Sequence, residues 1–246
     1  MMKKKELAEE VMKIAKKTGM IPLLFECGGN NPAIVLDDAD LDLAAKEIIK
    51  GAFSYSGQRC TAVKYVLAQD SVMDKLKPKL LKQLNKSGKL MVGSLISETA
   101  AQTCENRIIK AKVAGAEILT GGKRKGLYVE PTILDEVQPH FEIVKVETFG
   151  PVLSLIRVKT INEAVNIINN SIYGLQACIF TKDEGTAIRL SQRLNVGTVQ
   201  INNKPQRGPD HFPFLGVKGS GVGVQGVHYT LEAMTRLKSV VLSKPE

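Results

Sequence analysis

The stretch VLSLIRVKTINEAVNIINNSIYGLQACIF, residues 152–180, holds the pattern that decides the fold. Its two ends, VLSLIRV (152–158) and QACIF (176–180), are short apolar runs of the kind that form buried strands. Between them, INEAVNIINN (161–170) repeats its apolar residues at helical spacing. A strand, a helix and a second strand in this order are typical of a unit whose strands run parallel.

The same alternation of strand and helix patterns continues on both sides of this stretch. It predicts an α/β fold with a largely parallel sheet and flanking helices. The longest irregular segment, residues 202–227, is rich in Gly and Pro, and a loop of this length in a compact domain is more often functional than accidental. The further predicted strands are 21–26, 33–36, 63–68, 116–119, 197–201 and 238–242, and the further predicted helices are 4–17, 41–56, 71–86, 97–115, 184–194 and 229–237.

The composition suits one large globular domain or two small ones. The chain has 246 residues, of which 43% are hydrophobic and 24% are charged, an ordinary globular balance. No apolar run is long enough to span a membrane. The basic N-terminus MMKKKELAEE is not followed by the apolar stretch of a signal peptide. We therefore expect a cytoplasmic protein with no membrane segment.

The net charge of +9 raises the question of nucleic acid binding. The basic residues are spread along the chain, and no segment interleaves Arg and Lys with aromatic residues or shows zinc-finger spacing. The charge therefore indicates a solvated, lysine-rich surface, and no nucleic acid partner is expected. The three histidines have no metal-ligand spacing and the four cysteines form no CxxC pair, so we expect free thiols and no metal site.

Cys60 lies in the segment YSGQRCTA (55–62), after a predicted helix and a glycine-containing turn. A nucleophilic cysteine needs its thiolate, which a neighbouring cation such as Arg59 or backbone amides help to form. It also needs a second group that moves protons. Taken alone, a cysteine in a loop is more often an ordinary thiol than a nucleophile, so the candidate nucleophile requires a partner elsewhere in the chain.

Glu26 supplies a candidate partner in the segment LLFECGGNNP (23–32), where it ends an apolar run before two glycines. One interpretation is a carboxylate at a strand end that faces water. The other is a partly desolvated general base, with glycines that let the backbone and a ligand approach closely.

Together these segments resemble two signature motifs of the aldehyde dehydrogenase superfamily. FECGGNNP matches the glutamate motif, commonly L-E-L-G-G-x-x-P, and GQRC matches the cysteine motif G-Q-x-C. A third segment, VETFGPV (146–152), is similar to the family pattern E-x-F-G-P. The three motifs stand in the family's order, and the resemblance extends from about Lys13 to about Leu242.

The resemblance implies a role for each matching residue. Cys60 would attack the aldehyde carbon to form a thiohemiacetal, hydride would pass to the nicotinamide of NADP or NAD, and Glu26 would activate the water that hydrolyses the resulting thioacyl enzyme. Glu147 would hold the nicotinamide ribose, and Phe149 would pack near it. The backbone N–H of Cys60 would form half of the oxyanion hole.

Three segments look closest to the non-phosphorylating glyceraldehyde-3-phosphate dehydrogenases within this family. They are GQRCTA, RGPDHFPFLGVKGSG (207–221) and GVQG (223–226). In that subgroup cationic side chains receive the substrate phosphate, and Arg59 and Arg207 occupy the matching motifs, with Thr61 beside the nucleophile as a further substrate contact. Without the resemblance, Arg207 is as readily a surface charge. Semialdehyde and lactaldehyde dehydrogenases share much of the pattern, so the aldehyde stays open.

One glycine pattern does not fit a cofactor site. Gly221, Gly223 and Gly226 match G-x-G-x-x-G. A dinucleotide fingerprint requires a strand before the glycines, a helix opening on them and an acidic residue further on. Here they lie in the long irregular segment near the C-terminus, so we expect no dinucleotide binding there.

The resemblance also implies that a part is missing. Family members are about twice as long, and their N-terminal half contains most of the cofactor fold and an Asn, in a W-N motif, that completes the oxyanion hole. This chain has no Trp, and loss of one oxyanion donor costs about 10²–10³ in rate. We therefore expect residues 1–20 to resemble the end of the cofactor-binding half, and residues 21–246 to form the catalytic domain.

Four interpretations follow. The chain is a fragment, split-gene product or engineered domain; or it works with a partner chain that carries the cofactor domain; or it is a cofactor-independent esterase or thioesterase that uses Cys60 and Glu26. The fourth is a non-catalytic assembly module, since the family forms homo-oligomers through this half and its C-terminal strand. The choice between NADP and NAD stays open, because the residues that read the adenosine ribose lie in the other half.

Overall fold

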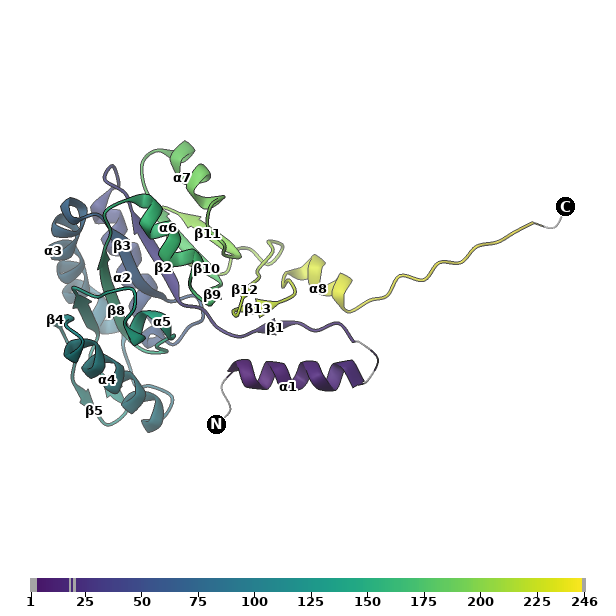
Figure 1. Cartoon of the computed structure of the whole chain (residues 1–246), viewed down its shortest axis with the longest axis horizontal. Coiled ribbons are helices and arrows are strands. Elements are labelled where there is room, and N and C mark those ends of the chain that lie inside the picture. Colours follow the sequence, from purple (N-terminus) through teal and green to yellow (C-terminus); the bar gives the residue numbers. More distant parts are fainter. Residues whose placement is uncertain (1–3, 18, 20, 245–246) are drawn as a thin grey trace.

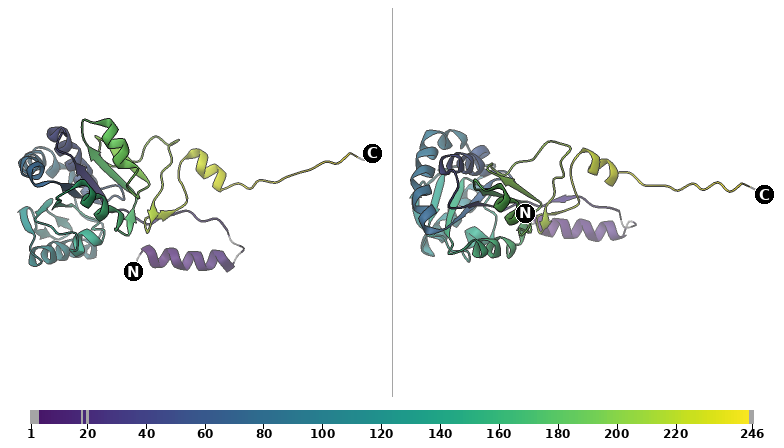
Figure 2. Two further views of the ribbon diagram at one scale, coloured as in Figure 1. Left: turned by 45° about the horizontal axis from the view of Figure 1, so that its top comes forward. Right: turned by 90° about the horizontal axis from the view of Figure 1, so that it is seen from above.

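The computed structural model describes residues 4–17, 19 and 21–244, and its body is a seven-stranded sheet with helices on both faces (Figures 1 and 2). The strand order is β11-β10-β2-β3-β8-β7-β4, and every neighbouring pair is parallel except β4 with β7. The predicted α/β fold with a largely parallel sheet is confirmed. The strands are β2 (Asn31–Val35), β3 (Val63–Ala68), β4 (Glu117–Thr120), β7 (Thr132–Asp135), β8 (Val152–Arg157), β10 (Gln176–Phe180) and β11 (Thr198–Ile201).

The alternating side chains of the strands divide the core into two layers. On β3, Val66 and Ala68 enter the cluster beneath α2 and α3, whereas Tyr65 and Leu67 enter the cluster beneath α4, α6 and α7. This division follows from the two-residue repeat of a strand, and it explains why the central strands read as continuous apolar runs. The helices are α2 (Leu41–Phe53), α3 (Asp70–Lys86), α4 (Glu98–Val113), α5 (Glu142–Lys145), α6 (Ile161–Asn169) and α7 (Glu184–Ser191).

Polar residues begin several of these helices. Asp40 accepts hydrogen bonds from the backbone N–H groups of Asp42 and Leu43 and so caps the start of α2. Ser97 and Thr160 cap α4 and α6 in the same manner. These caps fix where each helix leaves the preceding strand.

Two short strand pairs lie beside the main sheet. β1 (Phe25–Glu26) pairs antiparallel with β13 (Gly221–Val222), and β9 (Tyr173–Gly174) pairs antiparallel with β12 (Val217–Lys218). Both pairs bring the long irregular segment back against the body of the molecule (Figure 1). The remaining elements are α1 (Lys4–Lys17), η1 (Ser54–Gly57), η2 (Gly88–Met91), β5 (Arg124–Lys125), β6 (Tyr128–Val129) and α8 (Val227–Ala233).

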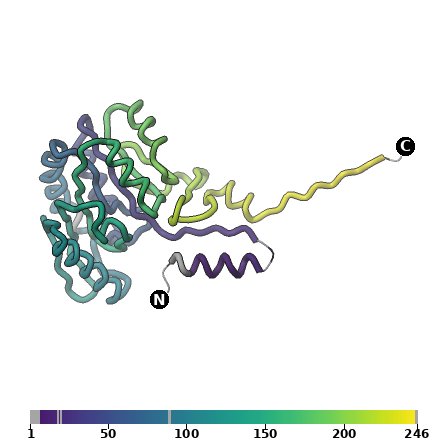
Figure 3. Tube along the Cα trace, in the orientation of Figure 1, coloured from purple at the N-terminus to yellow at the C-terminus, as the bar shows by residue number. Residues whose placement is uncertain are grey.

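Two sequence predictions are wrong at the ends of the chain. Residues 238–242 do not form a strand: they run extended and unpaired away from the body (Figure 3), with Leu242 91% exposed. A strand needs a neighbouring edge to complete its hydrogen bonds, and the described part of the chain places none beside this segment. The predicted strand 21–26 is shortened to β1 for the same reason, since β13 faces only its last two residues. None of the described helices is long and apolar enough to cross a membrane.

Candidate functional site

A cavity of about 520 Å³ gathers most of the residues that the sequence singles out. It is open to solvent where β1, the turn before β3 and the long irregular segment meet. The sequence positions involved lie far apart, so only the fold brings them together. The lining residues are Glu26, Gly28, Gln58, Arg59, Cys60, Thr61, Phe149, Arg207 and Phe214.

Glu147 lies directly beside this cavity and contacts the glycine pair. Its Oε1 accepts a hydrogen bond of 3.2 Å from the backbone N–H of Gly29. Gly28 has a φ of +122°, and a methyl group there would lie 2.5 Å from Oε2 of Glu147. At Gly29, a methyl group would overlap the carbonyl oxygen of Cys60. The two glycines are therefore needed for the Glu26 segment to approach both other loops closely.

The loop that carries Cys60 leaves α2 through a tight turn. Tyr55 and Ser56 have φ values of +55° and +58°, a backbone region that residues other than glycine rarely adopt. Gly57 continues the turn with a φ of +65°. The turn places the thiol of Cys60, which is partly buried, at the cavity wall.

The side chain of Asn31 fixes the other end of this loop. Its Nδ2 donates to the carbonyl oxygens of Cys60 at 2.7 Å and of Ala62 at 2.8 Å. Its Oδ1 accepts a hydrogen bond of 3.0 Å from the backbone N–H of Gln176. Asn31 is 1% exposed, and its bonds to Ala62 and Gln176 are buried while the bond to Cys60 is partly buried, so an unmade bond here is costly.

Lys64 is a buried cation close to the same loop. It is 4% exposed, and its Nζ donates to the carbonyl oxygens of Gly57 at 2.7 Å and of Gly150 at 3.2 Å. Sequence reasoning missed Lys64. The signal was available, because a lysine inside the apolar strand VKYVLA is out of place unless its ammonium has buried partners.

The loop with Glu147 and Phe149 is also held from outside the cavity. Arg107 on α4 donates from Nη1 to the carbonyl oxygen of Glu147 and, at 3.2 Å, to Oγ1 of Thr148. The backbone N–H of Glu147 donates to the hydroxyl of Tyr173 at 3.2 Å. Phe149 is 39% exposed at the cavity rim.

Glu26 is positioned by the short strand pair. It lies opposite Gly221, and the neighbouring N–H of Cys27 donates to the carbonyl oxygen of Ser220 at 2.9 Å. The Glu26 side chain is exposed, and its Oε2 accepts a hydrogen bond of 3.1 Å from Nε2 of Gln225. The Glu26 carboxylate therefore lies at the cavity and is open to solvent.

Two arginines give the cavity a cationic side. Arg59 is half-buried, and burial lowers the pKa of its guanidinium from the ordinary value. Its Nη2 donates to the carbonyl oxygen of Gly51 at 3.0 Å, while its buried Nε has no hydrogen-bond partner within the described chain. Arg207 is exposed, with Nε 3.8 Å from Asp210 and its guanidinium carbon 5.7 Å from the ring centre of Phe214. Thr61, 7% exposed, completes this side.

The G-x-G-x-x-G pattern near the C-terminus has a structural explanation. Gly221 belongs to β13, where a methyl group would overlap the carbonyl oxygen of Phe25. Gly223 and Gly226 have φ values of +83° and +131° and shape the turn before α8. Within the described ranges, no group of three His, Cys, Asp or Glu side chains is arranged to hold a metal ion, and none of the four cysteines forms a disulfide.

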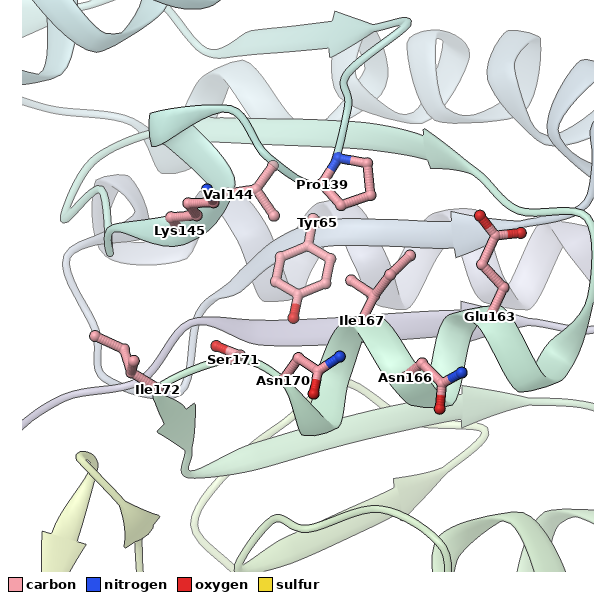
Figure 4. A pocket seen from close by; sticks show the side chains of 10 residues that line it. All are labelled: Tyr65, Pro139, Val144, Lys145, Glu163, Asn166, Ile167, Asn170, Ser171 and Ile172. Carbon is pink, nitrogen blue, oxygen red and sulfur yellow. The ribbon is translucent and has the colours of Figure 1, made fainter.

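A second cavity, of about 480 Å³, lies between α5 and the end of α6 and contains none of the predicted site residues. Tyr65 points its hydroxyl into this cavity, toward Asn170 and Ser171 (Figure 4). The chemistry that the sequence predicts therefore belongs to the cavity at Cys60.

Comparison with known proteins agrees with the motifs. Residues 4–240 match the model of the aldehyde dehydrogenase family. The chain is 48% identical over 241 residues to an NADP-dependent glyceraldehyde-3-phosphate dehydrogenase of Arabidopsis thaliana, covering 94% of this chain and 48% of the plant protein. It is 48% identical over 237 residues to a protein of the same name from Streptococcus equinus, covering 93% and 49%.

A solved structure shows the same relationship in three dimensions. The crystal structure of NADP-dependent glyceraldehyde-3-phosphate dehydrogenase from Bacillus halodurans C-125 complexed with NADP is similar with a TM-score of 0.87 and 50% sequence identity. The match covers 93% of this chain and 49% of that one. The chain therefore spans about half the length of the relatives that it matches.

Proposed function

Because the chain belongs to the aldehyde dehydrogenase family, we propose that the cavity at Cys60 oxidises an aldehyde, glyceraldehyde 3-phosphate, to its acid with NADP. One observation carries this proposal: a single cavity is lined by a candidate nucleophile, a candidate base and two arginines, namely Cys60, Glu26, Arg59 and Arg207. The names of the relatives support the same substrate and cofactor.

In this proposal Cys60 forms the covalent bond. Its thiolate attacks the aldehyde carbon, and the carbonyl electrons move to the oxygen, where the backbone N–H of Cys60 donates a hydrogen bond to the oxyanion. NADP, when bound, accepts the hydride that leaves this carbon. Glu26 then takes a proton from the water that attacks the thioacyl carbon, and the C–S bond breaks to release the acid and restore the Cys60 thiolate. Its exposure at the cavity mouth gives that water access.

The residues beside the cavity fit one end of NADP. The Glu147 carboxylate is fixed against Gly29, Gly28 offers no side chain there, and Phe149 presents an exposed ring. We assign the nicotinamide ribose to Glu147 and the nicotinamide face to Phe149. We further propose that residues 21–246 act as the catalytic domain, and that residues 1–20, with α1, correspond to the end of a cofactor-binding half that another segment or a partner chain completes.

Arg59 and Arg207 receive the substrate phosphate in this proposal, with Thr61 beside them. Arg59 has a buried Nε without a partner in the described chain, and such a donor gains most from a charged acceptor. Arg207 faces the same cavity from the long irregular segment. A guanidinium suits phosphate by both charge and geometry.

We also propose that the protein forms a cytoplasmic homo-oligomer through its C-terminal segment. The side chains of Leu237, Val240 and Val241 are 106%, 73% and 82% exposed. An extended apolar segment of this kind gains stability when it adds to a sheet edge of a second copy.

Protection of Cys60 from alkylation tests the substrate site without requiring turnover. The purified chain is treated with iodoacetamide, and labelling of Cys60 is followed by mass spectrometry with and without glyceraldehyde 3-phosphate. We expect the phosphorylated aldehyde to protect Cys60 at lower concentration than glyceraldehyde does. Arg207→Met should weaken protection by the phosphorylated aldehyde about tenfold, the value of a lost charged hydrogen bond.

The matched control is Arg193→Met, which removes a cation outside the cavity. Equal protection by both aldehydes in the unmodified chain would contradict the phosphate assignment. Labelling of Cys60 that neither aldehyde slows would contradict the proposed nucleophile. The cofactor is tested separately, by titrating NADP and NAD into the chain in a calorimeter.

A further inference from the structure

We propose that Lys64 is a positioning residue that couples the loop of the nucleophile to the loop that contacts the cofactor. The nucleophile loop is residues 57–60, and the cofactor loop is residues 147–150. The inference rests on the proposed function, since it concerns the same cavity. Lys64 does not line that cavity, and it reaches both loops from the protein interior.

The ammonium of Lys64 joins the two loops directly. Its Nζ donates to the carbonyl oxygen of Gly57 at 2.7 Å and to that of Gly150 at 3.2 Å. The residue is 4% exposed, and a buried ammonium is stable only when its hydrogen bonds are made. Each loop therefore supplies a bond that the cation requires.

The backbones of the loops also touch at this point. A methyl group at Gly57 would overlap the carbonyl oxygen of Gly150. Two carbonyl oxygens that lie close together repel each other, because both bear partial negative charge. A cation between them converts that repulsion into attraction, so Lys64 stabilises an approach that the loops alone would resist.

Lys64 itself has a rigid base. It belongs to β3, the central strand of the seven, which is hydrogen-bonded to β2 and β8. On the far side of the cofactor loop, Arg107 donates to the carbonyl oxygen of Glu147. The cofactor loop is thus held at one end by Arg107 and at the other by Lys64. A change at Glu147 reaches Gly57, and from there Cys60, through the ammonium.

Through Lys64, the position of the cofactor loop would control the reactivity of the nucleophile loop. Contact of a cofactor with Glu147 and Phe149 would shift or order the cofactor loop, and Lys64 would transmit that shift to the thiol of Cys60. Reactivity of Cys60 would then depend on whether the cofactor loop is in place, even though Cys60 lies in a different segment of the chain.

A double-mutant cycle tests the coupling. Arg107→Met loosens the cofactor loop without altering a lining residue of the cavity. We measure the rate of Cys60 alkylation in the unmodified chain, in Arg107→Met, in Lys64→Met and in the double variant. Arg107→Met should change the rate about threefold or more when Lys64 is present, and much less when Lys64 is replaced, since residues in one hydrogen-bond network are not additive.

Two further variants serve as controls in this test. Lys64→Arg retains a buried cation and should retain the effect of Arg107→Met. Lys218→Met removes another partly buried lysine whose Nζ donates to backbone carbonyl oxygens, those of Ile168 and Asn169, and should leave the effect intact. If Lys64→Met does not fold, as judged by circular dichroism, the comparison is made with Lys64→Gln.

Equal effects of Arg107→Met with and without Lys64 would overturn the coupling, as would no effect in either background. That outcome would leave the proposed function standing, because Cys60 would still react and still be protected by substrate. Failure of Cys60 to react in the unmodified chain would instead contradict the proposed function.

Discussion

The side-chain nitrogen of Asn31 lies 2.7 Å from the carbonyl oxygen of Cys60. The motif that supplies the candidate base therefore also holds the loop of the candidate nucleophile. Asn31 follows Glu26 by a few residues and opens β2, so the two motifs are joined by a partly buried hydrogen bond as well as by the cavity. The geometry of the site depends on a residue that does not line it.

Replacement of Asn31 by Ala should therefore disturb both stability and reactivity. It leaves the carbonyl oxygens of Cys60 and Ala62 and the N–H of Gln176 without this partner in the interior. We expect the free energy of unfolding in urea to fall by about 2–3 kcal/mol, and the rate of Cys60 alkylation to change. Asn162→Ala, an exposed amide on α6, should cost less than about 0.5 kcal/mol. Equal losses for the two variants would contradict this role of Asn31.

The four cysteine thiols should differ in how fast they are alkylated. Burial raises the pKa of Cys104 to about 11, and burial raises the pKa of Cys178 as well. At pH 8 both remain thiols in the folded chain, so iodoacetamide should label Cys60 and Cys27, which are partly exposed, and spare the other two. All four should react in urea. Mass spectrometry of the labelled peptides checks the order, and rapid native labelling of Cys104 would contradict the packing of α4.

The raised pKa of Cys104 also predicts how stability responds to alkali. The folded chain keeps this proton up to about pH 11, whereas the unfolded chain releases it near the ordinary value of 9.0. Between these pH values the folded state binds more protons, so the free energy of unfolding should decrease as pH rises from 9 toward 11. Urea titrations at a series of pH values measure the slope, which Cys104→Ala should reduce.

Asp38 should contribute stability that acid removes. Its carboxylate accepts hydrogen bonds from Oγ1 of Thr181 and from the N–H groups of Lys182 and Asp183, and the Thr181 bond is the largest cause of its lowered pKa. A depressed pKa means that this stability is present above the ordinary value of 3.8 and is lost as pH falls below it. Asp38→Asn should cost about 1 kcal/mol at pH 7 and almost nothing near pH 2, as measured by urea unfolding.

The ion pair of Lys77 with the buried Asp135 should stabilise the fold more than the exposed ion pair of Lys79 with Asp42. Asp135 has a side chain that is 0% exposed, and its Oδ2 lies 2.5 Å from Nζ of Lys77. Lys77→Met leaves a buried carboxylate whose other cation, Arg157, is 3.9 Å away, so we expect a loss of about 3 kcal/mol. Lys79→Met breaks the exposed pair with Asp42 and should cost below about 1 kcal/mol. Similar melting temperatures for both variants would contradict the difference.

The sequence predicts six of the seven strands of the main sheet but misses β7. β3 and β10 occupy the predicted residues, because strands buried on both faces are continuous apolar runs that polar residues bound. β7 was missed, because its sequence TILD has only two apolar residues, between a threonine and an aspartate. The predicted strand 238–242 has the right residues for a strand and lacks an edge within the described chain, which no local pattern reveals.

The residues of the candidate site were also predicted only in part. Cys60, Glu26, Glu147 and Arg59 belong to motifs that the sequence displays, and the fold brings all of them to one cavity or beside it. The residues that hold their loops were not found, because Asn31, Lys64 and Arg107 bond mainly to backbone carbonyl oxygens. Every residue has such a carbonyl oxygen, so a list of side chains does not show which ones a buried donor will meet.

Because β1 pairs with β13, the surroundings of Glu26 are complete only after residues 221–222 have been translated. Glu26 emerges early, yet the Gln225 amide that binds it follows 199 positions later, and the strand opposite it is Gly221–Val222. At about 5–20 residues per second, roughly ten to thirty seconds separate translation of Cys60 from translation of that strand. During this interval the nascent chain carries its thiol without a placed base. We therefore expect Cys60 to be open to oxidants and electrophiles before Glu26 is held beside it, and slower translation of residues 160–226 to prolong that exposure.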